Sequence, residues 1–299
     1  MENRDSPGAN PYAAPAARVA DPSAAAHPGN FSPDGDRVPA GHGMRWIVEG
    51  FGIFRAQPLV WVGVSLGFLV LTFAAQLIPI LGWLAGGILG PVWIAGVMIG
   101  CQDIMAGNRL RFSHLFAGFN ANGGRLMLFG LVNLLMIVLT SALGVALSYR
   151  ILGGGFSGDS LPSIAGIVFM AAVMLGFATP YLMLIWFGPP LIALSDQPVG
   201  AALRGSFFGC AKNWVPFLIY GLVLGVIALV VMVGVGAALG AVMGAAGFTM
   251  MGLVRGGTGG AMAGMGLGLL VTLLLSSLVL PLFFASLYAS FRDIYYRPE

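Results

Sequence analysis

Charged side chains are scarce in this sequence. Only 8% of the 299 residues are charged, whereas a soluble globular domain carries roughly 25%. So few charges cannot cover a water-facing surface of this size, and 58% of the residues are apolar. We therefore expect lipid, and not water, to surround most of the chain.

Cysteine and histidine are equally rare. The two cysteines, Cys101 and Cys210, are too few for a disulfide framework. No Glu or Cys stands at ligand spacing from His27, His42 or His114, so the sequence gives no support for a zinc site. We expect no metal and no other cofactor.

Motifs for other chemistry are also missing. The net charge of +3 is scattered, whereas nucleic-acid binding needs a clustered basic face. The glycine-rich stretch at 255–260 lacks the Lys-Ser/Thr ending of a phosphate-binding loop. An interfacial enzyme that used Glu49, Asp103 or Asp196 would lack an acid–base pair at a recognisable spacing. We expect a protein that is not an enzyme and does not bind nucleic acid.

Six apolar runs are long enough to cross a bilayer. A helix needs about 20 residues to span the hydrocarbon core, where it satisfies its own backbone hydrogen bonds. The runs cover residues 58–79, 81–101, 126–149, 163–187, 214–239 and 265–290. The sequence therefore predicts an all-α polytopic membrane protein with about six spans within residues 44–296.

Basic residues lie mainly on one side of these runs. In short loops, Lys and Arg stay on the cytoplasmic side. One side holds Arg45, Arg55, Arg109, Arg111, Arg125, Arg204, Lys212, Arg292 and Arg297, and the other holds Arg150 and Arg255. This predicts a polytopic protein with both ends in the cytoplasm.

The first 43 residues differ from the rest. They are rich in Pro, Ala, Gly and Asp and lack the apolar run of a cleavable signal peptide. Such a segment buries too little apolar surface to offset the entropy of ordering. We therefore expect residues 1–43 to form a disordered cytoplasmic tail.

A similar pattern precedes three of the runs. An aromatic residue is followed three positions later by an apolar residue, and three positions after that by an amide: Gln57, Asn122 or Asn213. The residues before each amide have amphipathic helical spacing, and in the first segment Arg45 and Glu49 are spaced for an i,i+4 ion pair. The pattern predicts three units, each an interfacial helix followed by a two-span hairpin. Alternatively, any helix that lies flat on a membrane would show it.

Glycine recurs at every fourth position in three places. Small residues at this spacing let helix backbones approach closely. The positions that we expect to pack in this way are Gly82, Gly86 and Gly90, then Gly236, Gly240 and Gly244, then Gly260, Gly264 and Gly268. The alternative for the last two groups is a flexible or re-entrant segment.

The densest polar segment lies between the second and third runs, at residues 101–114. Its two arginines and three more cations on the same side are candidates for contacts with anionic lipid headgroups. These residues are Arg109, Arg111, Arg125, Arg204 and Lys212. The alternative is that they only set the topology.

Two segments carry a resemblance to known proteins. They are FGIFRAQPLVW at 51–61 and GNRLRFSHLFAGF at 107–119. With the six-span layout, they resemble an uncharacterised family of proteobacterial integral membrane proteins. That family is distantly similar to YciC-like proteins and to the membrane-anchor domain of some glycerophosphodiester phosphodiesterases. The resemblance covers residues 44–296 and implies an inner-membrane location, but it carries over no catalytic residue.

Two functions fit these observations. The first is a non-enzymatic membrane scaffold or interaction protein, which would bind lipids and, through its tail or interfacial helices, other proteins. The second is a carrier or channel for a lipid or another amphiphilic molecule. It is suggested by Pro180, Pro189 and Pro190, since broken helices line the paths of transporters. The sequence specifies neither a ligand nor an oligomeric state.

Overall fold

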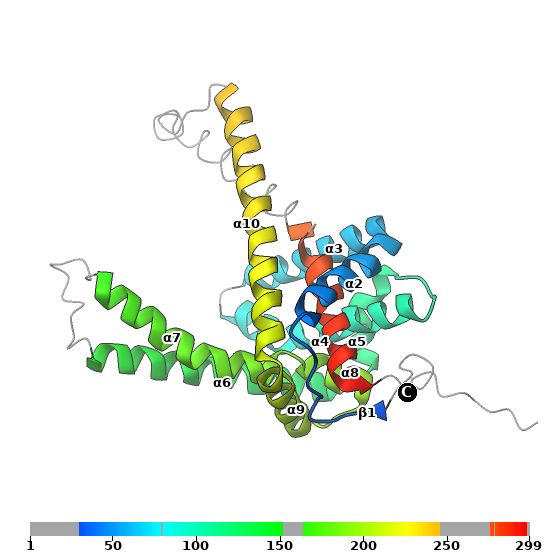
Figure 1. Ribbon diagram of the computed structural model, residues 1–299, viewed down its shortest axis with the longest axis horizontal. Helices are drawn as coiled ribbons and strands as arrows, with labels where there is room; N and C mark the ends of the chain where they lie inside the picture. The colour runs from blue at the N-terminus through cyan, green and yellow to red at the C-terminus, as the bar shows by residue number, and fades with distance from the viewer. Residues whose placement is uncertain (1–29, 79, 152–163, 246–275, 278, 298–299) are drawn as a thin grey trace, which may run out of the picture.

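The computed structural model describes residues 30–151, 164–245 and 276–297, except 79 and 278 (Figure 1). Its helices are α2 (His42–Ala56), α3 (Pro58–Gln76), α4 (Leu81–Met105), the 3-10 helix η1 (Phe112–Phe116), α5 (Ala117–Asn120), α6 (Gly123–Ile151), α7 (Ile164–Ile185), α8 (Gly188–Ser195), α9 (Val199–Lys212) and α10 (Trp214–Ala245). A C-terminal helix covers residues 279–295. The short strands β1 (Asn30–Phe31) and β2 (Tyr296–Arg297) pair in antiparallel fashion.

Four helical stretches are long and apolar enough to cross a membrane. They are Leu81–Met105, Gly123–Leu147, Ile167–Ser195 and Trp214–Gly234. A fifth results if α2 and α3, which meet at a bend of 100°, are counted as one broken span. The all-α polytopic class is confirmed, with four or five candidate spans among the described residues. The sixth predicted run, 265–290, is described only from residue 276 onward, except 278.

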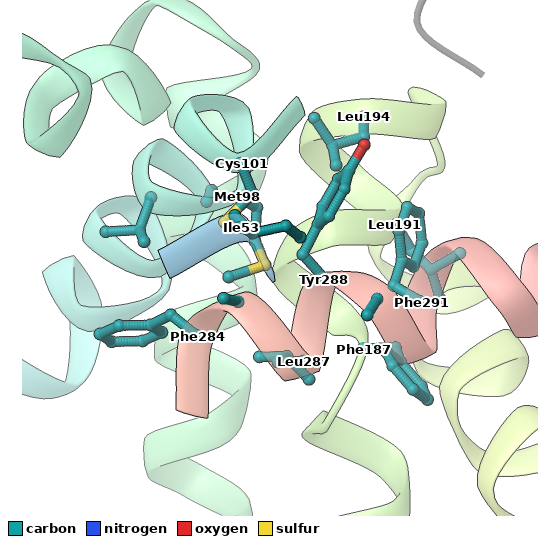
Figure 2. Packing of buried hydrophobic residues seen from close by; sticks show 14 of the residues in the cluster. Ile53, Met98, Cys101, Phe187, Leu191, Leu194, Phe284, Leu287, Tyr288 and Phe291 are labelled. Carbon is teal, nitrogen blue, oxygen red and sulfur yellow. The ribbon is translucent and has the colours of Figure 1, made fainter. Parts of the chain in front are cut away.

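The C-terminal helix forms the centre of the core. Its side chains Phe284, Tyr288 and Phe291 are at most 3% exposed. Figure 2 shows them among side chains of α2, α4 and α8, including Met98 and Cys101 from α4. The last helix of the chain therefore joins elements that come from its first, second and third quarters.

Three helices reach away from this core. In Figure 1, α6 and α7 run side by side in one direction, and α10 leaves in another. Each exposes large apolar side chains, for example Leu135 on α6, Leu175 on α7 and Leu222 on α10. Water disfavours apolar surface of this extent, which is why these faces fit a lipid environment.

Helix α2 has more than one apolar face. The ion pair expected on its polar side is present, with Arg45 Nε 2.6 Å from Glu49 Oε1. Trp46 is fully buried against Phe217 and Tyr220 of α10, whereas Val48 is 60% exposed. The helix is therefore anchored in the protein, and only part of its apolar surface is left for a membrane.

The predicted disordered tail, residues 1–43, is corrected in part. Residues 30–41 are placed: Phe31 pairs with Tyr296 in the β1–β2 ladder, and the Ser32 N–H donates to the Tyr295 carbonyl at 2.9 Å. The α2 helix begins at His42, before the predicted boundary. Local composition missed this order because the partners of the segment lie more than 170 positions away in the sequence. Residues 1–29 lie outside the described part.

The tight glycine contacts of α4 are not at the predicted positions. A Cβ at Gly90 would meet nothing within 4 Å, and one at Gly86 would meet only Gln76 Nε2, at 3.6 Å. Gly96, in contrast, lies directly against the carbonyl oxygen of His114. The spacing identified a small-residue stripe on α4, but the close backbone approach of the η1 loop is at Gly96, outside the three predicted positions.

Of the other predicted glycines, the described surroundings are known only in part. Gly82 is buried, and Gly236 faces open space. Gly240 and Gly244 lie in α10, where the structure does not describe their surroundings. Gly260, Gly264 and Gly268 lie outside the described residues, so their packing stays a prediction.

Gly96→Ala should lower the free energy of unfolding by about 1–3 kcal/mol, because the new methyl group would overlap the His114 carbonyl and force the backbone apart. Gly90→Ala, in the same helix, is the matched control and should keep or raise stability, since alanine favours a helix over glycine by about 1 kcal/mol. Thermal unfolding of both variants in detergent would test this. Equal unfolding midpoints would contradict it.

Candidate functional site

The chain turns sharply after α4. Gly107 has a φ of +82°, a value that glycine adopts readily. The Asn108 N–H donates to the Asp103 carbonyl at 2.8 Å, and the Gly107 N–H to that of Ile104 at 3.0 Å. These two bonds are the Schellman pattern that ends helices. The turn directs the next residues back across the end of α4.

Residues 109–111 then place two arginines on one side. Arg111 has extended backbone angles, and in extended chain successive side chains point in opposite directions. Leu110 points inward: it is 3% exposed and packs against Gly100. Arg109 and Arg111 therefore point outward together, and both are exposed.

His114 closes this loop onto α4. Its Nδ1 accepts a hydrogen bond from the Arg111 backbone N–H at 2.9 Å, which leaves the proton on Nε2. Nε2 lies 2.9 Å from Asp103 Oδ2 and donates to it. Because both ring nitrogens are engaged, the His114 side chain fastens the loop to the end of α4.

A polar pocket opens beside this pair. It is lined by Asp103, Gly107, Asn108, Arg109, Arg111, Ser113 and His114. The segment that looked densest in polar groups from the sequence thus does fold into one site. Its Asp–His contact was not predicted, although a spacing of 11 residues across a glycine turn is the signal that would have suggested it.

The other three residues that were predicted to contact lipid headgroups each bind a protein group. Arg125 Nη1 lies 2.6 Å from Asp196 Oδ1, and Arg204 Nη2 lies 3.1 Å from Asp34 Oδ2. The Lys212 ammonium donates to the Gly35 carbonyl at 2.8 Å. Arg125 and Arg204 are thus paired with aspartates far away in the sequence, and Lys212 with backbone carbonyls at residues 34 and 35. Whether these three residues also contact lipid headgroups stays a prediction.

Asn213 holds the N-terminal strap, which we define as residues 32–41. Its Oδ1 accepts from the Val38 N–H, and its Nδ2 donates to the Asp36 carbonyl, both at 2.8 Å. Nδ2 also donates to the Gly209 carbonyl at 2.9 Å. The side chain is 1% exposed, so it supplies partners for strap backbone groups that water cannot reach.

The strap covers a buried part of α9. Cys210 is buried there, and burial raises the pKa of its thiol to about 12, although a hydrogen bond to Ser206 works in the opposite direction. Burial also raises the pKa of the Tyr295 hydroxyl well above its usual value. Neither group ionises near neutral pH, so the described surroundings of Cys210 make it an inert thiol.

The two ends of the described chain meet a second time at Asp293. Its Oδ2 accepts from the Trp46 indole at 2.8 Å and lies 2.8 Å from His42 Nδ1. Nearby, Arg292 Nη2 lies 3.0 Å from Glu49 Oε2. These polar contacts fasten α2 to the C-terminal helix.

Asn213→Ala should release the strap. The change removes three hydrogen bonds and leaves buried backbone groups unsatisfied, which costs about 1–3 kcal/mol per group. We expect residues 32–41 to become sensitive to limited proteolysis and the unfolding midpoint to fall. Asn120→Ala, at an exposed asparagine, is the control and should change neither. Equal protection of the strap in both variants would contradict this role.

Comparison with known proteins places the chain among membrane proteins. It is 29% identical, over 198 residues, to a probable inner membrane protein of Burkholderia thailandensis. The matched region covers 62% of this chain and 73% of the relative. The chain matches no protein-family description and no solved structure. The finer resemblance, to YciC-like proteins and to the phosphodiesterase anchor, stays a prediction. The long apolar helices and the similarity to this relative together show that the chain is a multi-pass helical membrane protein.

Proposed function

We propose that this chain is a non-enzymatic scaffold or interaction protein of the bacterial inner membrane. The observation that carries the proposal is the filled break between α7 and α8. Breaks of this kind line the path in transporters. Here the freed Phe187 N–H donates to Ser206 Oγ at 2.9 Å, and Ser206 donates to the Met183 carbonyl at 2.7 Å. Phe187 itself is fully buried.

Close backbone contacts between the units also favour a rigid body. Gly43 of α2 lies against the Pro216 carbonyl oxygen of α10, and Gly118 of α5 against that of Val92 in α4. A carrier moves one part of its fold against another. Contacts between backbones leave no flexible side chain to absorb such a movement.

The orientation belongs to the same proposal. We infer that both chain ends lie in the cytoplasm, because the basic residues of the short loops are concentrated on that side. The pairing of β1 with β2 supports a shared side, since it joins the N-terminal segment to the C-terminal strand.

Fusions at the C-terminus test the orientation. A green fluorescent protein should be bright there and an alkaline phosphatase inactive, because the first folds in the cytoplasm and the second only outside it. The converse result would contradict the orientation and leave the scaffold proposal to be tested separately.

A second candidate is a carrier of apolar molecules, and one observation favours it. A groove of about 400 Å³ lies between α10 and the C-terminal helix. It is lined by apolar side chains such as Leu224, Ile227, Leu280 and Phe283. Its size falls within the range of small-molecule sites, roughly 300–1,000 Å³.

Site-specific photo-crosslinking in cells separates the two candidates. A photoreactive amino acid would replace exposed Leu135 on α6 or Leu222 on α10, with buried Trp46 as the position that partners cannot reach. A scaffold should give a reproducible crosslink to one protein at Leu135 or at Leu222, and no crosslink at Trp46. Lipid adducts alone at every exposed position, together with movement of labelled phospholipid across proteoliposomes, would favour the carrier and overturn the scaffold.

A further inference from the structure

A second pocket lies where α2 bends into α3. We call it the junction pocket; it is lined by Gln57, Pro58, Leu59, Val60, Arg109 and Arg111, together with Ala56 and Leu110. Its volume is about 640 Å³. Arg109 and Arg111 therefore border two pockets, the polar one beside His114 and this one, whose lining contains no acidic side chain.

Gln57 is the first of the three junction amides, and all three begin a helix in the same way. The carbonyls of Gln57, Asn122 and Asn213 each accept a hydrogen bond from the N–H four residues later, at 3.0–3.1 Å. The three amides thus occupy equivalent backbone positions at the starts of α3, α6 and α10. Their side chains can be compared as members of one series.

In two of the three junctions, the amide and a nearby cation hold an aspartate-bearing segment. At the second junction, Asn122 Nδ2 and Arg125 Nη1 both donate to Asp196 Oδ1, at 3.0 and 2.6 Å. At the third junction, Asn213 and Lys212 hold the backbone of the strap at residues 34–38. Arg204 adds an ion pair to the carboxylate of Asp34.

The first junction has the same donors without the acid. Gln57 makes no side-chain cap bond to α3, and it shares its pocket with Arg109 and Arg111. In the described part of the chain, no carboxylate lies within ion-pair distance of either arginine. The donors of this junction are therefore arranged for an anion that the described chain does not supply.

We propose that the junction pocket binds the phosphate headgroup of an anionic membrane phospholipid. Two arginines and an amide match the oxygens of a phosphate diester. The remaining lining is apolar, and Leu59 is 86% exposed at the first turn of the apolar α3. Acyl chains require such a surface beside the headgroup site, and free phosphate does not. This binding would locate the protein among anionic lipids and is independent of the scaffold role.

Lipid titration of the full-length protein tests the site. In detergent micelles, native mass spectrometry would count bound phosphatidylglycerol against phosphatidylcholine. We expect a preference for phosphatidylglycerol that the double variant Arg109→Gln/Arg111→Gln lowers by roughly 30-fold, since each arginine near a lipid surface contributes about fivefold. The control Arg125→Gln/Arg204→Gln removes the same charge outside the pocket and should keep the preference.

Three further outcomes decide the nature of the ligand. Equal losses in the two double variants would overturn the proposal, because they would mean general attraction to charge. Inorganic phosphate that displaces phosphatidylglycerol completely would assign the pocket to a soluble anion, and an oligo-aspartate peptide that does so would assign it to an acidic segment. Leu59→Gln should weaken the binding of phosphatidylglycerol without changing that of inorganic phosphate. A thermal midpoint equal to that of the parent protein shows that each variant is folded.

Discussion

Three hydrogen bonds of the Asn213 amide fasten the N-terminal strap to α9. They satisfy backbone groups of the strap and of α9 that have left water, and an unsatisfied group there would cost about 1–3 kcal/mol. Apolar burial alone gives little direction to a protein surrounded by lipid, because a lipid tail is as apolar as leucine. Polar contacts at the helix ends therefore decide how the helices meet. Ser206 makes such a polar contact at the α7–α8 break, and Asp293 makes one with Trp46 of α2.

This rule separates what the sequence could predict from what it could not. The apolar runs predicted the helices, because a long uncharged stretch in lipid has only one way to satisfy its backbone. Thus α4, α6 and α10 begin within three residues of their expected starts. The strap was missed because Asn213 and its partner Val38 are 175 positions apart. The local composition of residues 30–41 does not indicate that the side-chain amide of Asn213 binds their backbone.

The site shows the same division. The sequence correctly selected residues 101–114 as polar and basic, but charge alone could not tell a free arginine from a paired one. Arg109 and Arg125 look alike in the sequence, yet Asp196 binds only the second. The close approach on α4 is at Gly96, and not at Gly86 or Gly90, for a related reason. Their spacing shows that a backbone could approach α4, while the neighbour that does approach Gly96 is a loop whose course depends on the Gly107 turn and the His114–Asp103 contact.

The pairing of β1 with β2 and the contact of Trp46 with Asp293 join residues that a ribosome produces far apart in time, since Trp46 and Asp293 are 247 positions apart. The intervening helices must enter the bilayer one after another while α2 still lacks its final partner. The core can close only when the C-terminal helix has been made, so release before it would yield an inserted chain in which the Trp46 indole N–H lacks its Asp293 acceptor. Membrane proteases and chaperones could then recognise an incomplete chain by this missing contact between α2 and the C-terminal helix.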